Sequence, residues 1–107
     1  MDKPPVRIAI IEDEEIAGLR LPEHLAESGH PIDLYFEGES FLKAFQAAPH
    51  DLVITDLKLP GLSGMDIIRE VKNRRRDTEV VVITGYASID SAIEAVRAGA
   101  FHYLTKP

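Results

Sequence analysis

Short apolar runs alternate along the chain with segments in which apolar residues recur every three or four positions. The runs are rich in Val and Ile and suit buried strands, whereas the longer period is typical of helices. The connections are long enough to bring consecutive strands into parallel pairing. The order strand, helix, strand, helix therefore predicts an α/β, doubly wound parallel sheet. The predicted strands are 6–11, 32–36, 53–55, 79–84 and 100–105.

The first two predicted helices follow the first two strands. The first has apolar residues at Ala17, Leu21 and Leu25, ends at Ser28-Gly29 and contains Pro22. Because proline removes a backbone donor, this segment is either one kinked helix or two shorter ones. The second helix opens at Gly38-Glu39-Ser40 and closes at 47–49, with Phe41 and Phe45 paired one turn apart.

The third predicted helix starts after Pro60-Gly61, with Ser63 as its cap and Asp66 three residues later. Its expected apolar face is Met65, Ile68 and Val71. The basic turn 72–77 at its end is predicted to be a solvated helix terminus rather than a binding patch.

The fourth predicted helix is capped by Ser88 and ends at Gly99, which occupies the position where glycine usually terminates a helix. Its expected apolar face consists of Ile89, Ala92, Ile93 and Val96.

Composition limits the classes of function. The chain has 107 residues, enough for one domain with one main core, and 45% of them are hydrophobic. A formal net charge of −6 argues against nonspecific nucleic-acid binding, and the absence of cysteine excludes disulfides and thiolate metal sites. The first apolar run is too short for a signal peptide or a membrane span, so we expect a cytoplasmic protein.

Polar residues stand where four of the five predicted strands end: Glu12 and Asp13, Asp56, Thr84, and Lys106. Taken singly, each has an ordinary explanation as a helix cap, a strand threonine or a solvated lysine. Because the carboxyl ends of parallel strands share one edge of the sheet, all of them are expected to converge.

Three converging carboxylates need compensation. At separations of about 5 Å each pair repels by roughly 3 kcal/mol at an effective dielectric constant of about 20. A divalent cation with oxygen ligands offsets this repulsion, and the ligand type favours Mg²⁺. Such sites commonly hold a phosphoryl group, for which an aspartate can act as the nucleophile.

These residues resemble the receiver domain of two-component response regulators. The resemblance rests on Glu12-Asp13, Asp56 with Pro60-Gly61, Thr84-Gly85, and Tyr103-x-x-Lys106-Pro107. It covers nearly the whole chain, and the segments 82–88 and 103–107 are similar to receivers of nitrogen-regulation-type transcriptional activators. The resemblance implies a flavodoxin-like strand order 2-1-3-4-5. It also implies one domain over residues 1–107 that lacks the final helix.

The resemblance further implies roles for individual residues. Asp56 would accept a phosphoryl group from a histidine kinase. Asp13, Asp56 and the backbone carbonyl of Lys58 would ligate Mg²⁺ directly, and Glu12 would act mainly through water. Lys106 would pair with the phosphoryl oxygens.

Other residues would act as a switch or set the lifetime of the phosphorylated form. Thr84 would move to bind the phosphoryl group, and Tyr103 would rotate inward behind it. Lys58 and Tyr86 flank the site and would tune the rate of dephosphorylation, which we expect Tyr86 to slow.

The resemblance also implies partners. These are a sensor histidine kinase and an output domain or downstream protein, with no direct nucleic-acid or membrane contact by this segment. Without a final helix, exposed apolar strand surface is expected to favour self-association. We assign no role to His102 and expect His24, His30 and His50 to be surface residues.

Three other functions are weaker fits. A haloacid-dehalogenase-like phosphatase would need an acid two residues after the nucleophile, where Lys58 stands. A flavin-binding carrier would need a phosphate-binding loop after Ile11, where acids stand instead. A receiver-like interaction module that is never phosphorylated stays open.

Overall fold

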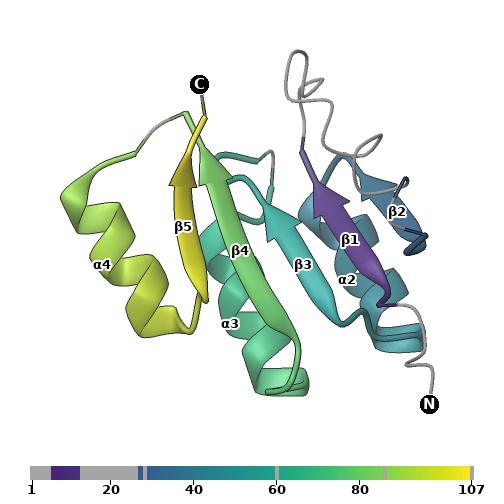
Figure 1. The fold of residues 1–107 in the computed structure, drawn as a ribbon. Coiled ribbons are helices and arrows are strands. Elements are labelled where there is room, and N and C mark those ends of the chain that lie inside the picture. The colour runs from purple at the N-terminus through teal and green to yellow at the C-terminus, as the bar shows by residue number, and fades with distance from the viewer. Residues whose placement is uncertain (1–5, 13–26, 28, 60, 86, 107) are drawn as a thin grey trace.

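Five parallel strands form one sheet in the order β2-β1-β3-β4-β5 (Figure 1). The structure, a computed structural model, describes residues 6–12, 27, 29–59, 61–85 and 87–106. The predicted strand order and parallel pairing are confirmed. The strands are β1 (Ile8–Ile11), β2 (Ile32–Tyr35), β3 (Leu52–Thr55), β4 (Glu79–Thr84) and β5 (His102–Thr105).

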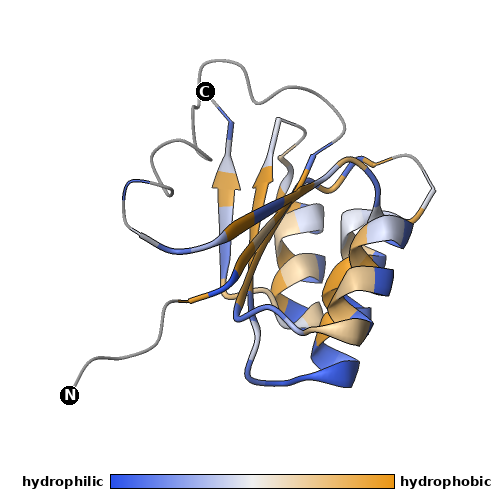
Figure 2. Cartoon of the chain, turned by 90° about the vertical axis from the view of Figure 1, so that its right-hand side faces the viewer, coloured by the Kyte–Doolittle hydropathy of each residue, from blue (hydrophilic) through white to orange (hydrophobic). Residues whose placement is uncertain are grey.

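Three helices in the described part of the chain lie side by side on one face of the sheet (Figure 2). They are α2 (Gly38–Ala47), α3 (Gly64–Arg74) and α4 (Ile89–Ala98). No helix follows β5 within the described residues, as expected. The predicted first helix, after β1, falls on residues 13–26 and 28, outside the described residues.

Alternation along the strands gives the sheet two apolar faces. The face beneath the helices contains Ala9, Val53, Val80 and Val82, none of which is exposed to solvent. On the opposite face Ile8, Ile10 and Ile54 form a second buried cluster. In β4, however, Val81 and Ile83 are only partly buried, so this strand is fully buried only on the face beneath the helices.

The predicted helix ends are confirmed by hydrogen bonds. The Ser63 hydroxyl accepts from the amide of Asp66, and the Asp66 carboxylate accepts from the amide of Ser63. Ser88 caps α4 in the same reciprocal way with Ser91. Gly99 ends α4 with a φ of 114°, a left-handed conformation that favours glycine.

The prediction that the apolar face of α4 packs in the core is wrong. Ile89 is 80% exposed, Ile93 45% and Val96 60%, and the fully buried residue of this helix is Ala95. The helix presents its small residues to the rest of the fold, and its large apolar side chains point to solvent. On α3, by contrast, Ile68 and Val71 are buried as expected, together with Ile67.

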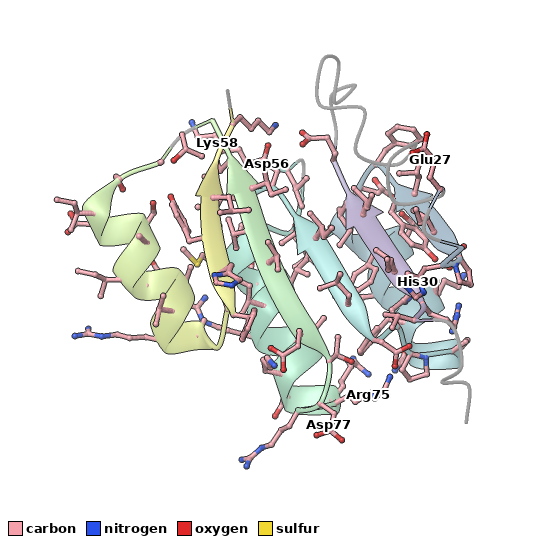
Figure 3. All side chains as sticks on the ribbon, viewed as in Figure 1. Glu27, His30, Asp56, Lys58, Arg75 and Asp77 are labelled. Atoms are coloured by element: carbon pink, nitrogen blue, oxygen red, sulfur yellow. The ribbon has the colours of Figure 1, made fainter. Side chains whose placement is uncertain are left out.

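The prediction that His50 lies on the surface is also wrong. It is fully buried against the rings of Phe41 and Phe45, and its Nε2 lies 2.9 Å from the Asp33 carboxylate. Its carbonyl accepts hydrogen bonds from Thr78 and Arg75. Arg75 therefore contributes to internal contacts at this end of the sheet and is not simply part of a solvated terminus (Figure 3).

Asp51 joins this network from the start of β3. One carboxylate oxygen accepts from the Arg7 amide at 2.9 Å, and the other accepts from the Arg75 guanidinium at 3.2 Å. The hydrogen bond from the Arg7 amide lowers the pKa of Asp51 against the opposing effect of burial, and Arg75 lowers it further. The ionised carboxylate therefore stabilises the fold.

We expect Asp51→Asn to reduce the pH dependence of stability in acid. The folded-state pKa lies below the ordinary value of 3.8. The stabilisation by Asp51 is therefore present above that value and lost as pH falls through the folded-state pKa. Because the Asp51 side chain is 40% exposed, we expect Asp51→Asn to lower the free energy of unfolding at neutral pH by only about 0.5–1 kcal/mol.

Urea unfolding at neutral pH and at about pH 3 measures this difference. The control is Asp77→Asn, which changes an exposed acid near the same end of the sheet (Figure 3). If wild type and Asp51→Asn lost equal stability between the two pH values, Asp51 would have no such role.

Candidate functional site

The parallel register places the predicted acids next to one another. Ile11 pairs with Thr55, so Glu12 and Asp56 leave neighbouring strands at the same level. The Asp56 amide donates to the Ile11 carbonyl at 3.2 Å. On the other side, the Lys106 amide donates to the Thr84 carbonyl at 2.9 Å, which fixes the chain just after β5. The edge of the sheet therefore gathers residues that are far apart in sequence.

One ammonium group lies between two buried carboxylates. The Lys106 Nζ is 2.7 Å from an Asp56 oxygen and 2.8 Å from a Glu12 oxygen. The two acidic side chains are only 4% and 8% exposed, respectively. At such separations in a poorly solvated site, a single positive charge offsets the repulsion between the acids.

The three charged groups shift one another's pKa values. Burial raises the pKa of Glu12, and the Asp56 charge adds to this effect, while Lys106 opposes it. Burial alone would raise the pKa of Asp56 as well, but hydrogen bonds from Lys106, the Lys58 amide and the Thr84 hydroxyl outweigh it and lower that pKa. The two carboxylates raise the pKa of Lys106 despite its burial. Asp56 is thus kept ionised at neutral pH.

The loop after β3 contributes a backbone donor to the same acid. The Lys58 amide lies 3.2 Å from the second oxygen of Asp56, while the rest of Lys58 is exposed. Figure 3 shows Asp56 and Lys58 at the same edge of the sheet. Both Asp56 oxygens therefore accept hydrogen bonds, one from Lys106 and one from this amide.

The acids fit a cation with oxygen ligands. Within the part of the chain that the structure describes, one oxygen of Glu12 is buried without a hydrogen-bond partner, which is costly unless a donor or a cation satisfies it. Glu12 and Asp56 are hard oxygen donors of the type that Mg²⁺ prefers. Within the described residues no group of three metal-ligating side chains occurs. Asp13, the third predicted acid, lies outside those residues.

The described part of the chain brings together Glu12, Asp56, Thr84 and Lys106. Tyr86 falls outside the described residues. Tyr103 is partly buried on β5, and its hydroxyl lies 2.6 Å from the Ser91 hydroxyl of α4. No signal in the residue pattern singles out Ser91, because this contact joins two elements whose packing the pattern does not specify.

A comparison with protein families identifies the domain. Residues 8–107 match the model of the response regulator receiver domain. The chain belongs to this family. Receiver domains are the phosphoacceptor signalling modules of two-component response regulators. In the part of the receiver that the structure describes, no helix is long and apolar enough to cross a membrane.

The receiver is similar to transcription regulators of two groups. It is 35% identical over 102 residues to the transcriptional regulatory protein QseB of Escherichia coli O157:H7, covering 95% of this chain and 47% of QseB. It is 49% identical over 59 residues to the response regulator PilR of Pseudomonas aeruginosa, covering 55% of this chain and 13% of PilR. The relatives thus include NtrC-family activators, as the sequence suggested, and also OmpR-family regulators.

Among solved structures, a Burkholderia pseudomallei response regulator containing a phosphorylated aspartic acid, calcium and citrate is 31% identical. Its TM-score is 0.86, and the match covers 95% of this chain and 60% of that one. This chain spans about half the length of the first curated relatives it matches.

We expect Lys106→Met to destabilise the receiver because it leaves Glu12 and Asp56 facing each other without a cation. Removing one partner of a largely buried ion pair costs about 3 kcal/mol. Urea unfolding at neutral pH with a metal chelator measures the loss. Added Mg²⁺ should restore more stability to this variant than to wild type.

The control is Lys43→Met, which removes an exposed lysine of α2. Equal stabilities for the two lysine variants would contradict the structural role of Lys106.

Proposed function

We propose that Asp56 is the phosphoacceptor of this receiver and takes its phosphoryl group from a sensor histidine kinase. The observation that carries the proposal is the buried, ionised Asp56 held by Lys106 beside Glu12. The phosphorylated aspartic acid in the Burkholderia pseudomallei relative supports it. Signalling of the phosphorylated state to an output domain or downstream partner is part of the proposal.

In the proposed reaction an Asp56 carboxylate oxygen attacks the phosphorus of a phosphohistidine. The new O–P bond forms as the P–N bond breaks, and the released imidazole nitrogen keeps the electron pair and takes a proton from solvent. Lys106 then pairs with a phosphoryl oxygen in place of the carboxylate. The transferred group is thus stabilised chiefly by positioned charges.

Mg²⁺ fits the site and would supply positive charge against the phosphoryl oxygens. We propose that Asp13, Asp56 and the Lys58 carbonyl hold it directly and that Glu12 acts through water. The unpartnered oxygen of Glu12 is consistent with a water or ion in that position. Slow self-phosphorylation from small donors and slow self-dephosphorylation are expected of the same arrangement.

The switch in this proposal links the acid to α4. Phosphorylation adds strong acceptor oxygens, which the Thr84 hydroxyl can bind after a small movement. Tyr103, on the neighbouring strand, would rotate inward as Thr84 moves. Its present hydrogen bond to Ser91 holds it against the first turn of α4, so the two arrangements differ in this contact.

Lifetime tuning by Lys58 and Tyr86 stays a prediction. Self-association also stays a prediction. The exposed apolar residues of α4, which are Ile89, Ile93 and Val96, are consistent with it. The alternative is an interaction module that is never phosphorylated. Incubation with a phosphodonor, described next, distinguishes the two functions.

The decisive test is incubation with acetyl phosphate and Mg²⁺ followed by intact mass measurement. Wild type should gain the mass of one phosphoryl group, and Asp56→Asn should gain none, because an amide is not a nucleophile for this transfer. The control Asp77→Asn should behave as wild type. No gain by wild type, from this donor or from a phosphorylated histidine kinase, would favour the interaction module.

We expect Tyr103→Phe to bind the phosphate mimic beryllofluoride, with Mg²⁺, about fivefold more tightly. Loss of one hydrogen bond of about 1 kcal/mol would release Tyr103 from the resting arrangement. Isothermal titration measures the affinity, and Tyr35→Phe on β2 is the control. Unchanged or weaker binding by Tyr103→Phe would show that the contact with Ser91 does not favour the resting state.

A further inference from the structure

Gly64 lies directly against the backbone of the candidate phosphoacceptor. A methyl group built on its Cα would overlap the carbonyl oxygen of Asp56 and lie 2.7 Å from the Cα of Leu57. The Gly64 amide also donates to the Leu57 carbonyl at 2.9 Å. The first residue of α3 is therefore in contact with the two residues that follow β3, and no side chain fits between them.

This contact differs from those of the other glycines in the described part of the chain. At Gly38 a methyl group would meet side-chain atoms of Ile67 and Leu62 at 3.0–3.1 Å. At Gly61 it would meet the carboxylate of Glu39, the mobile end of a side chain. Among the glycines that the structure describes, only Gly64 would bring the added group into overlap with backbone, which cannot rotate away.

Helix α3 is poorly able to move and relieve such an overlap. Ile67 and Ile68 are fully buried one turn into the helix, so a shift would disturb the core. The Ser63–Asp66 capping box fixes the first turn as well. Leu57, by contrast, is only partly buried, and both Asp56 and Leu57 lie beyond the last residue of β3. The displacement would therefore fall mainly on the residues that carry the site.

We propose that Gly64 is a positioning residue for phosphoryl transfer: because it has no side chain, the backbone of Asp56 and Leu57 packs directly against α3. This packing sets the direction of the Asp56 carboxylate and the position of Lys58, whose amide donates to that carboxylate. The inference rests on the proposed function, since positioning has a catalytic consequence only if Asp56 accepts phosphate. A misplacement of about 1 Å in such a group can lower a rate by up to about 100-fold.

The test compares Gly64→Ala with wild type in phosphorylation by acetyl phosphate and Mg²⁺, at a rate normalised to the folded fraction. Gly64→Ala should be phosphorylated about 10- to 100-fold more slowly. Val71→Ala, which truncates a fully buried residue of the same helix, is the control for stability. Gly38→Ala is the control for the chemical change. Both controls should keep the wild-type rate per folded molecule.

The backbone displacement is measured separately by the amide NMR signals of Lys58 and Leu57 without any phosphodonor. They should shift in Gly64→Ala and stay near their wild-type positions in both controls. This readout keeps the inference testable if wild type accepts no phosphate, a result that would count against the proposed function alone.

A wild-type rate in folded Gly64→Ala, or unshifted amide signals, would overturn the inference. If Gly64→Ala is unfolded in buffer, an excluded osmolyte such as trimethylamine N-oxide, added to all variants, favours the folded state. Failure to fold even then would also count against the proposal, because it places the disturbance in the whole fold and not at Asp56.

Discussion

The edge of the sheet is held together by a single ammonium group shared by two buried acids. Without Lys106, Glu12 and Asp56 would stand at the ends of neighbouring strands with like charges and little water between them. With it, the repulsion becomes an attraction that ties the end of β5 to β1 and β3. In the proposed function the same contact would make the site responsive, because a phosphoryl group attached to Asp56 would offer that ammonium a more negative partner.

The fold supplies this contact through strand order. β1 and β3 are neighbours, so their final residues emerge side by side, and β4 carries Thr84 beside them. β5 lies at the edge, from which Lys106 reaches across β4 toward both acids. Residues far apart in the sequence thus meet because parallel strands all end at one edge of the sheet.

The sequence predicted most of the helix ends, which depend on local residue pattern, and the residues that meet where the parallel strands end. Ser63, Ser88 and Gly99 marked helix ends by their own chemistry, and Asp56 marked the end of a buried strand. The exposed face of α4 could not be predicted, because apolar spacing at Ile89, Ile93 and Val96 does not say whether neighbouring elements or solvent cover it. The burial of His50 could not be predicted, because it depends on contacts with Asp33 and with the rings of α2 that the residue pattern does not specify. The tight fit at Gly64 is a contact between backbones, which residue types do not record.

The most direct measurement is a crystal structure of the receiver with Mg²⁺ and beryllofluoride. We expect beryllofluoride on Asp56 and the cation between Asp56 and the acids after β1. The Lys106 ammonium should have moved from the Asp56 carboxylate to a fluorine atom. A structure in which Lys106 still joined Glu12 to Asp56, with beryllofluoride absent from Asp56, would contradict this expectation.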